Sequence, residues 1–308
     1  MQEKSQDFRY EVLEGPLVER FRAANQTFEG DGIIKVWPPG CAMFAEYRNY
    51  ADRVRRLAVR EDDVWVVTYP KSGTTWMQEM VWLLVNNLDY KTARSILQTE
   101  RSPYLETGCL VKEAARTKAN IRDSVREVEM LKSPRCIKTH LPLQMLPEQL
   151  WTVRPKIIYV ARDAKDVAVS YYNHHRLFFG YAGSSEDFFE ALVIALTVGV
   201  CLGTRTADFL NCTLNSEEMK QLCDHLSFES MKNNPSVSHE IEVAKLRGMQ
   251  TNINGEIQPF MRKGKVGSWK QDITPETEKK LNLCTKMKLA DTDYVLPFTK
   301  ENCTAKMK

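Results

Sequence analysis

The clearest hydrophobic pattern along this chain begins at Val64. Residues 64–69, Val-Trp-Val-Val-Thr-Tyr, are a β-branched and aromatic run that predicts a buried strand. A turn follows over residues 70–75, and a predicted helix comes next, lined by Trp76, Met77, Met80, Val81, Leu83 and Leu84. The stretch 64–84 therefore predicts a strand, a loop and a helix in succession.

Two further apolar runs predict short strands. Arg135–Lys138 is a short run with a proline near each end, and Pro155–Val160 leads into a turn and a helix over residues 164–175, with Asp163 as a plausible N-cap. Three short strands, two of them running into helices, predict an α/β fold. We expect a single domain with a central, mostly parallel sheet flanked by helices.

The remaining patterns are less regular. Glycines and prolines in residues 1–40 predict an irregular lead-in, and apolar spacing predicts a helix over 43–57 that packs on the sheet. Residues 86–105 are expected to be a connector, and 113–130 helical in parts. The aromatic-rich stretch 177–189 fits either ordinary core or the wall of an apolar pocket. The most apolar run, 191–202, fits a core helix because it is too short to span a bilayer.

Composition narrows the class of protein. The 308 residues are 43% hydrophobic and 27% charged, with a net charge of only +3, so no broad basic field for nucleic acid is present. None of the eight cysteines forms CxxC or pairs with histidine at zinc spacing, which predicts reduced thiols and no metal. The polar, acidic first residues resemble neither a signal nor a transit peptide. We therefore expect a cytoplasmic protein with no membrane association.

The loop at residues 70–75 has the residues of an anion cradle. Gly73 lets a ligand approach the backbone, Thr74 and Thr75 add hydroxyl donors, and a helix begins there with free N–H groups beside Lys71. The loop lacks the GxxxxGK[ST] order of nucleotide hydrolases. The alternative is an ordinary strand-to-helix turn with a capping hydroxyl.

Cationic side chains also follow the two other predicted strands. Lys138 and His140 come at the end of one strand, and Arg162 at the end of the other, where ligands gather in parallel sheets. His140 could instead be a satisfied core histidine, and Arg162 could pair with Asp163 or Asp166. Residues 260–269 place three cations and two glycines between aromatics, which fits a second phosphate site or a solvated basic loop.

Five segments together resemble the cytosolic sulfotransferases. They are TYPKSGTTW, KTHLP, IYVARDAKDVAVSYY, LSFESMKNNP and FMRKGKVGSWK, in that family's order. The family transfers a sulfuryl group from 3′-phosphoadenosine 5′-phosphosulfate (PAPS) to a hydroxyl or amine of a small molecule. The resemblance implies a lead-in and helix over 1–60, then a sulfotransferase domain over 61–308, family-like at 61–191 and 209–298.

The resemblance also implies roles for particular residues. The P-loop-like phosphosulfate-binding loop would comprise Lys71, Ser72, Gly73, Thr74, Thr75 and Trp76, with Trp76 stacked on adenine. The 3′-phosphate would be held by Arg162, Ser170, Arg262, Lys263 and Gly264, and the adenine bordered by Ser227, Phe228 and Met231. Tyr104 and Phe178 would line the acceptor pocket. His140 would be the general base, while Lys71 and Lys138 would offset developing charge; no metal is needed.

The chain departs from the family over residues 192–208. A strand, a helix and a nucleotide-contacting tyrosine expected there are missing, on the order of forty residues. Two hypotheses therefore stay open, an active sulfotransferase acting on small hydroxylated apolar molecules and a catalytically inactive nucleotide-binding variant. A P-loop kinase is a weaker third. A homodimer is possible, but the family's dimer motif is altered because Pro275 follows Thr274 where valine is expected.

Overall fold

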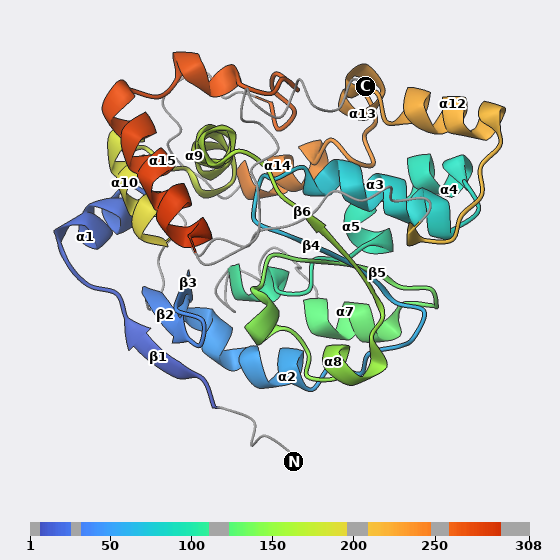
Figure 1. Ribbon diagram of the computed structural model, residues 1–308, viewed down its shortest axis with the longest axis horizontal. Coiled ribbons are helices and arrows are strands. Elements are labelled where there is room, and N and C mark those ends of the chain that lie inside the picture. Colours follow the sequence, from blue (N-terminus) through green and yellow to red (C-terminus); the bar gives the residue numbers. More distant parts are fainter. Residues whose placement is uncertain (1–6, 26–31, 111–122, 196–208, 248–258, 291–308) are drawn as a thin grey trace.

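A parallel sheet of three strands lies at the centre of the molecule (Figure 1). Its order is β5 (Cys136–Thr139), β4 (Val64–Thr68) and β6 (Lys156–Val160). All five residues of β4 are buried, as expected for a β-branched run covered on both faces. The predicted α/β fold with a parallel sheet is confirmed, and the three strands lie close to their predicted bounds.

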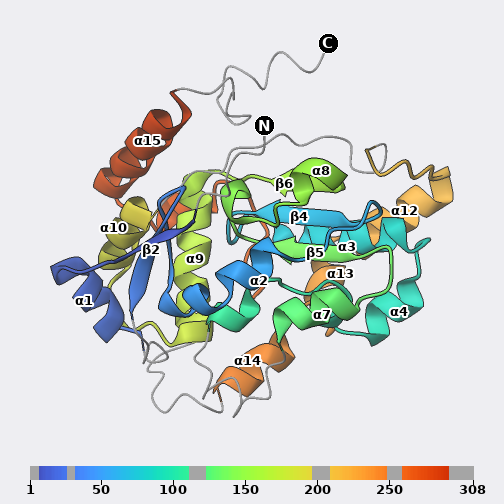
Figure 2. The same ribbon diagram turned by 90° about the horizontal axis from the view of Figure 1, so that it is seen from below.

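Alternate residues of β4 pack into two different helical layers. Trp65 and Val67 belong to the core cluster that includes residues of α2 (Ala51–Arg55) and α7 (Ser124–Met130). Val64 and Val66 pack with α3 (Thr74–Val85) instead. In Figure 1, α3 lies on one side of the strands and α2, α7 and α8 (Leu150–Val153) lie on the other, and Figure 2 shows α9 (Ala164–Phe179) beside the sheet. The helices thus cover both faces of the sheet and leave the strand ends for the loops.

The structure describes residues 7–25, 32–110, 123–195, 209–247 and 259–290. The further α-helices in these ranges are α1 (Pro16–Ala23), α4 (Tyr90–Ser95), α5 (Gln98–Arg101), α10 (Ser185–Ala195), α12 (Ser216–His225), α13 (Phe228–Lys232), α14 (Glu240–Arg247) and α15 (Pro275–Leu289). The 3₁₀ helices are η1 (Ala45–Asn49), η2 (Thr107–Leu110), η3 (Leu143–Met145) and η4 (Ser268–Gln271). Within these ranges no helix is long and apolar enough to cross a membrane.

The expectation of an irregular lead-in over residues 1–40 is wrong. An antiparallel sheet forms there from β1 (Arg9–Val12), β2 (Ile33–Trp37) and β3 (Cys41–Phe44), and α1 begins at Pro16. The glycines and prolines punctuate these elements. Pro16 takes the first position of α1, where its missing N–H costs nothing, and Gly40 forms the β2–β3 turn at φ +94°.

Two other elements also differ from prediction. Residues 43–57 form the end of β3, η1 and α2 in place of one helix, and the expected connector over 86–105 contains α4 and α5. Tyr47, Tyr50, Val54 and Leu57 share one buried cluster, so the apolar spacing arose from burial of three short elements. In the other stretch, the Asp89 side chain accepts the N–H of Thr92 and caps α4.

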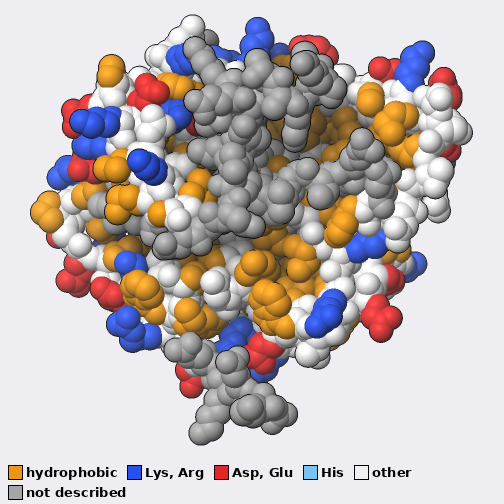
Figure 3. All heavy atoms as spheres, viewed as in Figure 1, with side chains coloured by type: hydrophobic (Ala, Val, Ile, Leu, Met, Phe, Trp, Pro, Cys, Tyr) orange, Lys and Arg blue, Asp and Glu red, His pale blue; other side chains and the backbone are white. Residues whose placement is uncertain are grey.

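The aromatic stretch 177–189 divides between the core and the site. Tyr181, Phe188 and Phe189 are buried in a cluster with α9, α10 and α15, whereas Phe178 lies near Phe260. The run 191–202 is helical as far as Ala195, and residues 196–208 lie outside the described residues. The six described cysteines are free thiols. Figure 3 shows charged side chains of both signs interspersed around one face of the molecule.

Candidate active site

The loop after β4 brings the chain into α3 through two unusual backbone conformations. Lys71 has φ 67° and Gly73 has φ 109°, and α3 begins at Thr74. Gly73 tolerates this conformation because it has no Cβ. The Thr74 hydroxyl lies 2.7 Å from that of Thr68. The first N–H groups of α3 lack helical partners, so the loop and the helix form an anion-binding terminus.

Two cations that are far apart in the sequence line a small cavity beside this loop. Its walls include Lys71, Ser170 on α9 and Arg262 from the C-terminal loop. Arg162 donates to the Lys71 carbonyl over 3.2 Å. Burial, followed by repulsion from Lys138 and Arg162, lowers the pKa of Lys71 to about 7. An anion in this cavity would relieve that repulsion.

His140 lies at the carboxyl end of β5 with one ring nitrogen committed. Its Nδ1 is 2.8 Å from the Thr68 carbonyl, which can only accept a hydrogen bond, so Nδ1 carries the proton. Burial, reinforced by Lys138, lowers the pKa of His140 well below its ordinary value. The ring is therefore neutral near pH 7, and its Nε2 holds a lone pair that can accept a proton.

Two aromatic rings, one from α3 and one from α13, form a flat slot. The rings of Trp76 and Phe228 are nearly parallel, at 7°, with centroids 6.2 Å apart. The Trp76 indole N–H donates to the Leu226 carbonyl over 2.9 Å, which fixes its plane. Met231 packs in the same cluster, and Ser227 caps α13 by accepting the N–H of Ser230. This geometry suits a planar, aromatic ligand group.

The C-terminal loop is fastened to the rest of the site at several points. Gly264, at φ +60°, passes so close to Phe228 that an added Cβ would lie 2.3 Å from its ring. The Gly267 N–H donates to Asp166 on α9 over 2.8 Å. Arg262 and Lys263 lie 3.7 and 3.6 Å from the carboxylate of Asp272. Gly264 therefore lies against the slot, whereas Arg262 lines the cavity.

The two predicted acceptor-pocket residues lie on different walls. The Tyr104 ring is 4.9 Å from that of His140, and the ammonium of Lys138 lies 4.3 Å above it. The Phe178 ring lies 4.3 Å from His174 and 6.0 Å from Phe260. Phe260 in turn lies 3.9 Å from the ammonium of Lys71. Aromatic surface thus borders the cationic groups from two directions.

The family model of the sulfotransferase domain matches residues 61–202 and 204–293. The chain belongs to the sulfotransferase domain family. The break in the match falls inside residues 192–208, where family-like sequence was expected to be missing.

Curated sulfotransferases are similar over most of this chain. It is 33% identical over 289 residues to luciferin sulfotransferase of Photinus pyralis, covering 81% of this chain and 77% of that one. It is 29% identical over 279 residues to sulfotransferase 1E1 of Homo sapiens, covering 79% and 89% respectively. Retinol dehydratase, solved with androsterone and the inactive cofactor PAP, superposes with a TM-score of 0.80 and 26% identity over 95% of this chain and 99% of its own.

This sulfotransferase is a PAPS-dependent enzyme that transfers a sulfuryl group to a small-molecule acceptor. The activity and the co-substrate predicted from the sequence are confirmed, and none of the comparisons favours the inactive variant. In the described part of the sulfotransferase, no group of three or more His, Cys, Asp or Glu side chains could hold a metal ion.

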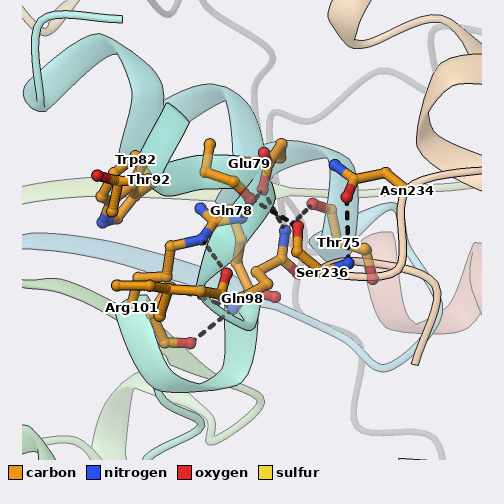
Figure 4. Close-up of polar contacts among 12 residues, drawn as sticks. Thr75, Gln78, Glu79, Trp82, Thr92, Gln98, Arg101, Asn234 and Ser236 are labelled. Carbon is orange, nitrogen blue, oxygen red and sulfur yellow. Dashed lines mark hydrogen bonds and ion pairs between the residues drawn. The ribbon is translucent and has the colours of Figure 1, made fainter. Parts of the chain in front are cut away.

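Sequence reasoning missed the buried polar groups that hold this site together. Figure 4 shows Glu79 on α3 among its partners Gln98 and Arg101, at 3.0 and 2.5 Å. His225, one residue before Leu226, lies 2.8 Å from the same carboxylate. Gln98 also donates to the Thr75 carbonyl over 3.0 Å. This network joins α3 to the segment that carries Phe228.

Glu106 is the second buried acid that the sequence did not reveal. It is 1% exposed and accepts the N–H of His140 over 2.6 Å. The only hint in the sequence is that Glu106 directly follows Tyr104 and Leu105. Apolar neighbours of this kind do not show that a glutamate is buried.

Proposed function

We propose that this sulfotransferase acts on a hydroxyl of a small apolar molecule, with His140 as the general base. The observation that carries the proposal is the geometry of His140, whose Nδ1–H is held by the Thr68 carbonyl at 2.8 Å. Its Nε2 is thereby free to take the acceptor proton, and its lowered pKa keeps it unprotonated at neutral pH. A positioned base of this kind typically contributes ~10²–10⁴-fold in rate.

The donor site proposed for PAPS fits the groups present. Trp76 and Phe228 would hold adenine between parallel rings, with Ser227 and Met231 at its border. Ser72, Gly73, Thr74, Thr75 and the α3 N-terminus would hold the 5′-phosphosulfate beside Lys71. When bound, PAPS supplies the sulfuryl group. Lys71 and Lys138 then stabilise charge on the sulfuryl oxygens and the departing phosphate.

The 3′-phosphate is assigned to the cationic cavity. Ser170 on α9 and Arg262 from the C-terminal loop line it, and Arg162, which follows β6, donates to the carbonyl of Lys71, another of its lining residues. Lys263 and Gly264 belong to the same loop as Arg262. Burial, with a smaller contribution from the charge of Arg262, lowers the pKa of Arg162, which supports an anionic ligand beside it.

The acceptor site is assigned to the aromatic surface around His140, with Tyr104 and Phe178 in its walls. Such a surface favours apolar, hydroxylated molecules. The similarity to luciferin sulfotransferase and to a protein solved with androsterone supports this class of acceptor. We further propose a cytoplasmic location, a domain spanning residues 61–308, and a homodimer whose contact differs from the family's at Pro275.

Turnover with labelled PAPS and a panel of phenols, apolar alcohols, sterols and amines tests this function. We expect sulfated product from at least one apolar hydroxyl compound, and weaker or no product from compact polar alcohols. Binding of 3′-phosphoadenosine 5′-phosphate (PAP), followed by calorimetry, is the matched control for an intact donor site. PAP binding without any turnover across the panel would contradict the proposal.

A further inference from the structure

A buried glutamate lies directly behind the catalytic strand. Residues 103–106 run beside β5, because the Lys138 N–H donates to the Pro103 carbonyl over 3.0 Å and the Leu105 N–H donates to the Lys138 carbonyl over 2.9 Å. Glu106 follows this pairing and is 1% exposed. Its side chain therefore belongs to the turn that carries Lys138 and His140.

The Glu106 carboxylate is bonded on both oxygens. Oε1 accepts the backbone N–H of His140 over 2.6 Å, and Oε2 accepts the hydroxyl of Thr139 over 2.9 Å. The Thr139 oxygen also accepts the N–H of Leu141 over 3.1 Å. The carboxylate thus closes the turn in which His140 sits, and a shift of Glu106 would tilt the ring away from the Thr68 carbonyl.

Glu106 differs from the other deeply buried acids in how its charge is balanced. Asp63 is paired with Arg135 at 2.6 Å and Glu79 with Arg101 at 2.5 Å. Within the described residues, Glu106 has no ion pair inside 4 Å and receives only N–H and hydroxyl donors. A cation that acts on its charge is Lys138, whose ammonium lies 4.3 Å from the centre of the Tyr104 ring.

The charges of Glu106 and Lys138 are linked. Burial raises the pKa of Glu106 to about 7, and burial lowers the pKa of Lys138 to about 8 although Glu106 acts to raise it. Glu242 on α14 acts on Lys138 in the same direction more weakly. Lys71, His140, His174 and His239 face the Lys138 charge and would oppose it if protonated.

We propose that Glu106 is a positioning residue for sulfuryl transfer, which fixes the turn that presents His140 and keeps Lys138 charged. The inference rests on the proposed roles of Lys138 and His140. It assigns Glu106 no contact with either substrate. A purely structural acid would affect stability without moving the titration of Lys138.

Glu106→Gln tests the charge while keeping the shape of the side chain. The pH dependence of acetic anhydride labelling, resolved by mass spectrometry, reports the titration of each lysine. We expect the Lys138 midpoint to fall by about one pH unit, since an opposite charge nearby typically shifts a pKa by 1–3 units. Lys156, whose ammonium donates to the Leu210 carbonyl, is the internal reference and should not move.

Two further variants separate charge from position. Glu106→Asp keeps the charge but shortens the reach, so the Lys138 midpoint should stay near that of the parent while kcat falls at least tenfold. Glu242→Gln removes the second, more weakly acting carboxylate and should shift the midpoint less than Glu106→Gln. The melting temperature and the dissociation constant for PAP are also measured for each variant, and both should change little.

An unchanged Lys138 midpoint in folded Glu106→Gln would overturn the inference. If Glu106→Gln does not fold, the Asp variant decides, because a fall in its midpoint, or unchanged kcat, would equally overturn it. The variants Lys138→Met and His140→Ala distinguish a failure of this inference from a failure of the proposed function. Full turnover in both would contradict the proposed function while leaving the measured link between Glu106 and Lys138 intact.

Discussion

At the residue scale, the cationic side chains of the site lie close to one another and are partly shielded from solvent. Lys71 is half-buried, and burial followed by repulsion from Lys138 and Arg162 lowers its pKa. Anionic ligands reverse both penalties, because a phosphate supplies the countercharge that burial removed. Binding of PAP should therefore be coupled to uptake of a proton by Lys71 near neutral pH.

The affinity for PAP should fall as pH rises above 7. The pKa of free Lys71 is lowered from 10.5 to about 7, so its charge is present below that pH and lost above it. The dissociation constant, measured by calorimetry from pH 6 to 9, should rise by up to about tenfold per pH unit above pH 7. Lys71→Met should flatten this dependence, and an unaltered slope in the variant would assign the proton to another group.

Arg162→Ala should discriminate between two nucleotides. Loss of a hydrogen bond to a charged group costs about 1.5–3 kcal/mol, so PAP binding should weaken by about 10–100-fold. Binding of adenosine 5′-monophosphate, which lacks the 3′-phosphate, should change much less. Arg176→Ala, on the helix α9 that follows Arg162 and with its guanidinium 5.9 Å from the centre of the Tyr172 ring, is the matched control. Equal losses for both nucleotides would show that Arg162 does not contact the 3′-phosphate.

The sequence revealed the cations of the site but not its buried acids. Lys71, Lys138 and Arg162 each lie at or just after the end of a recognisable strand, and that placement alone brings them to one edge of the sheet. Glu79 and Glu106 are as polar as any surface residue, and only packing of distant segments buries them. Arg262 and Ser170 lie at one cavity although they are far apart in the sequence. The loop that carries Arg262 is held to α9 by the hydrogen bond from the Gly267 N–H to Asp166, and no local sequence pattern predicts that contact.

At the scale of elements, the slot between Trp76 and Phe228 depends on a glycine in another segment. Gly264→Ala would place a Cβ 2.3 Å from the Phe228 ring and strain a backbone at φ +60°. We expect PAP affinity to fall by at least tenfold as the ring is displaced. Isothermal calorimetry and a melting curve measure the two effects.

Gly267→Ala is the matched control for Gly264→Ala. It sits in the same loop at φ +76°, but an added Cβ would meet nothing within 4 Å. It shares the backbone strain, about 1–2 kcal/mol, without the clash. Similar losses of affinity in both variants would show that loop strain, and not the slot, governs PAP binding.

The sequence predicted a strand correctly where every residue of that strand is buried. The run that forms β4 is buried along its whole length, so its β-branched residues mark a strand unambiguously. The N-terminal sheet was missed because β1 exposes most of its residues, so no buried apolar run marks it. The apolar positions over 43–57 that predicted one helix belong largely to η1 and α2, which both pack into the same core cluster.

At the scale of the whole molecule, catalysis and stability occupy opposite ends of the sheet. Lys138 lies near the carboxyl end of β5, and His140 and Arg162 follow the carboxyl ends of β5 and β6. Asp63 and Arg135 precede β4 and β5 and form a two-point ion pair at 2.7 and 2.6 Å. Arg135 is 2% exposed, so its charge depends on that pair.

Arg135→Met should destabilise the fold without altering the chemistry. Removing one partner of a buried ion pair typically costs about 3–5 kcal/mol. Urea unfolding should show this loss, while kcat per folded molecule stays within about twofold. Arg53→Met breaks an exposed pair with Asp123 at 2.8 Å and should cost no more than about 1 kcal/mol. Similar losses in both variants would contradict the buried-pair account.

The turnover of His140→Ala under saturating PAPS shows whether His140 is the general base. We expect kcat to fall by ~10²–10⁴-fold, while the melting temperature and the dissociation constant for PAP stay close to those of the parent. A turnover that falls only in proportion to lost folded protein would contradict that role, because His140 would then be a packing residue and another group would remove the acceptor proton.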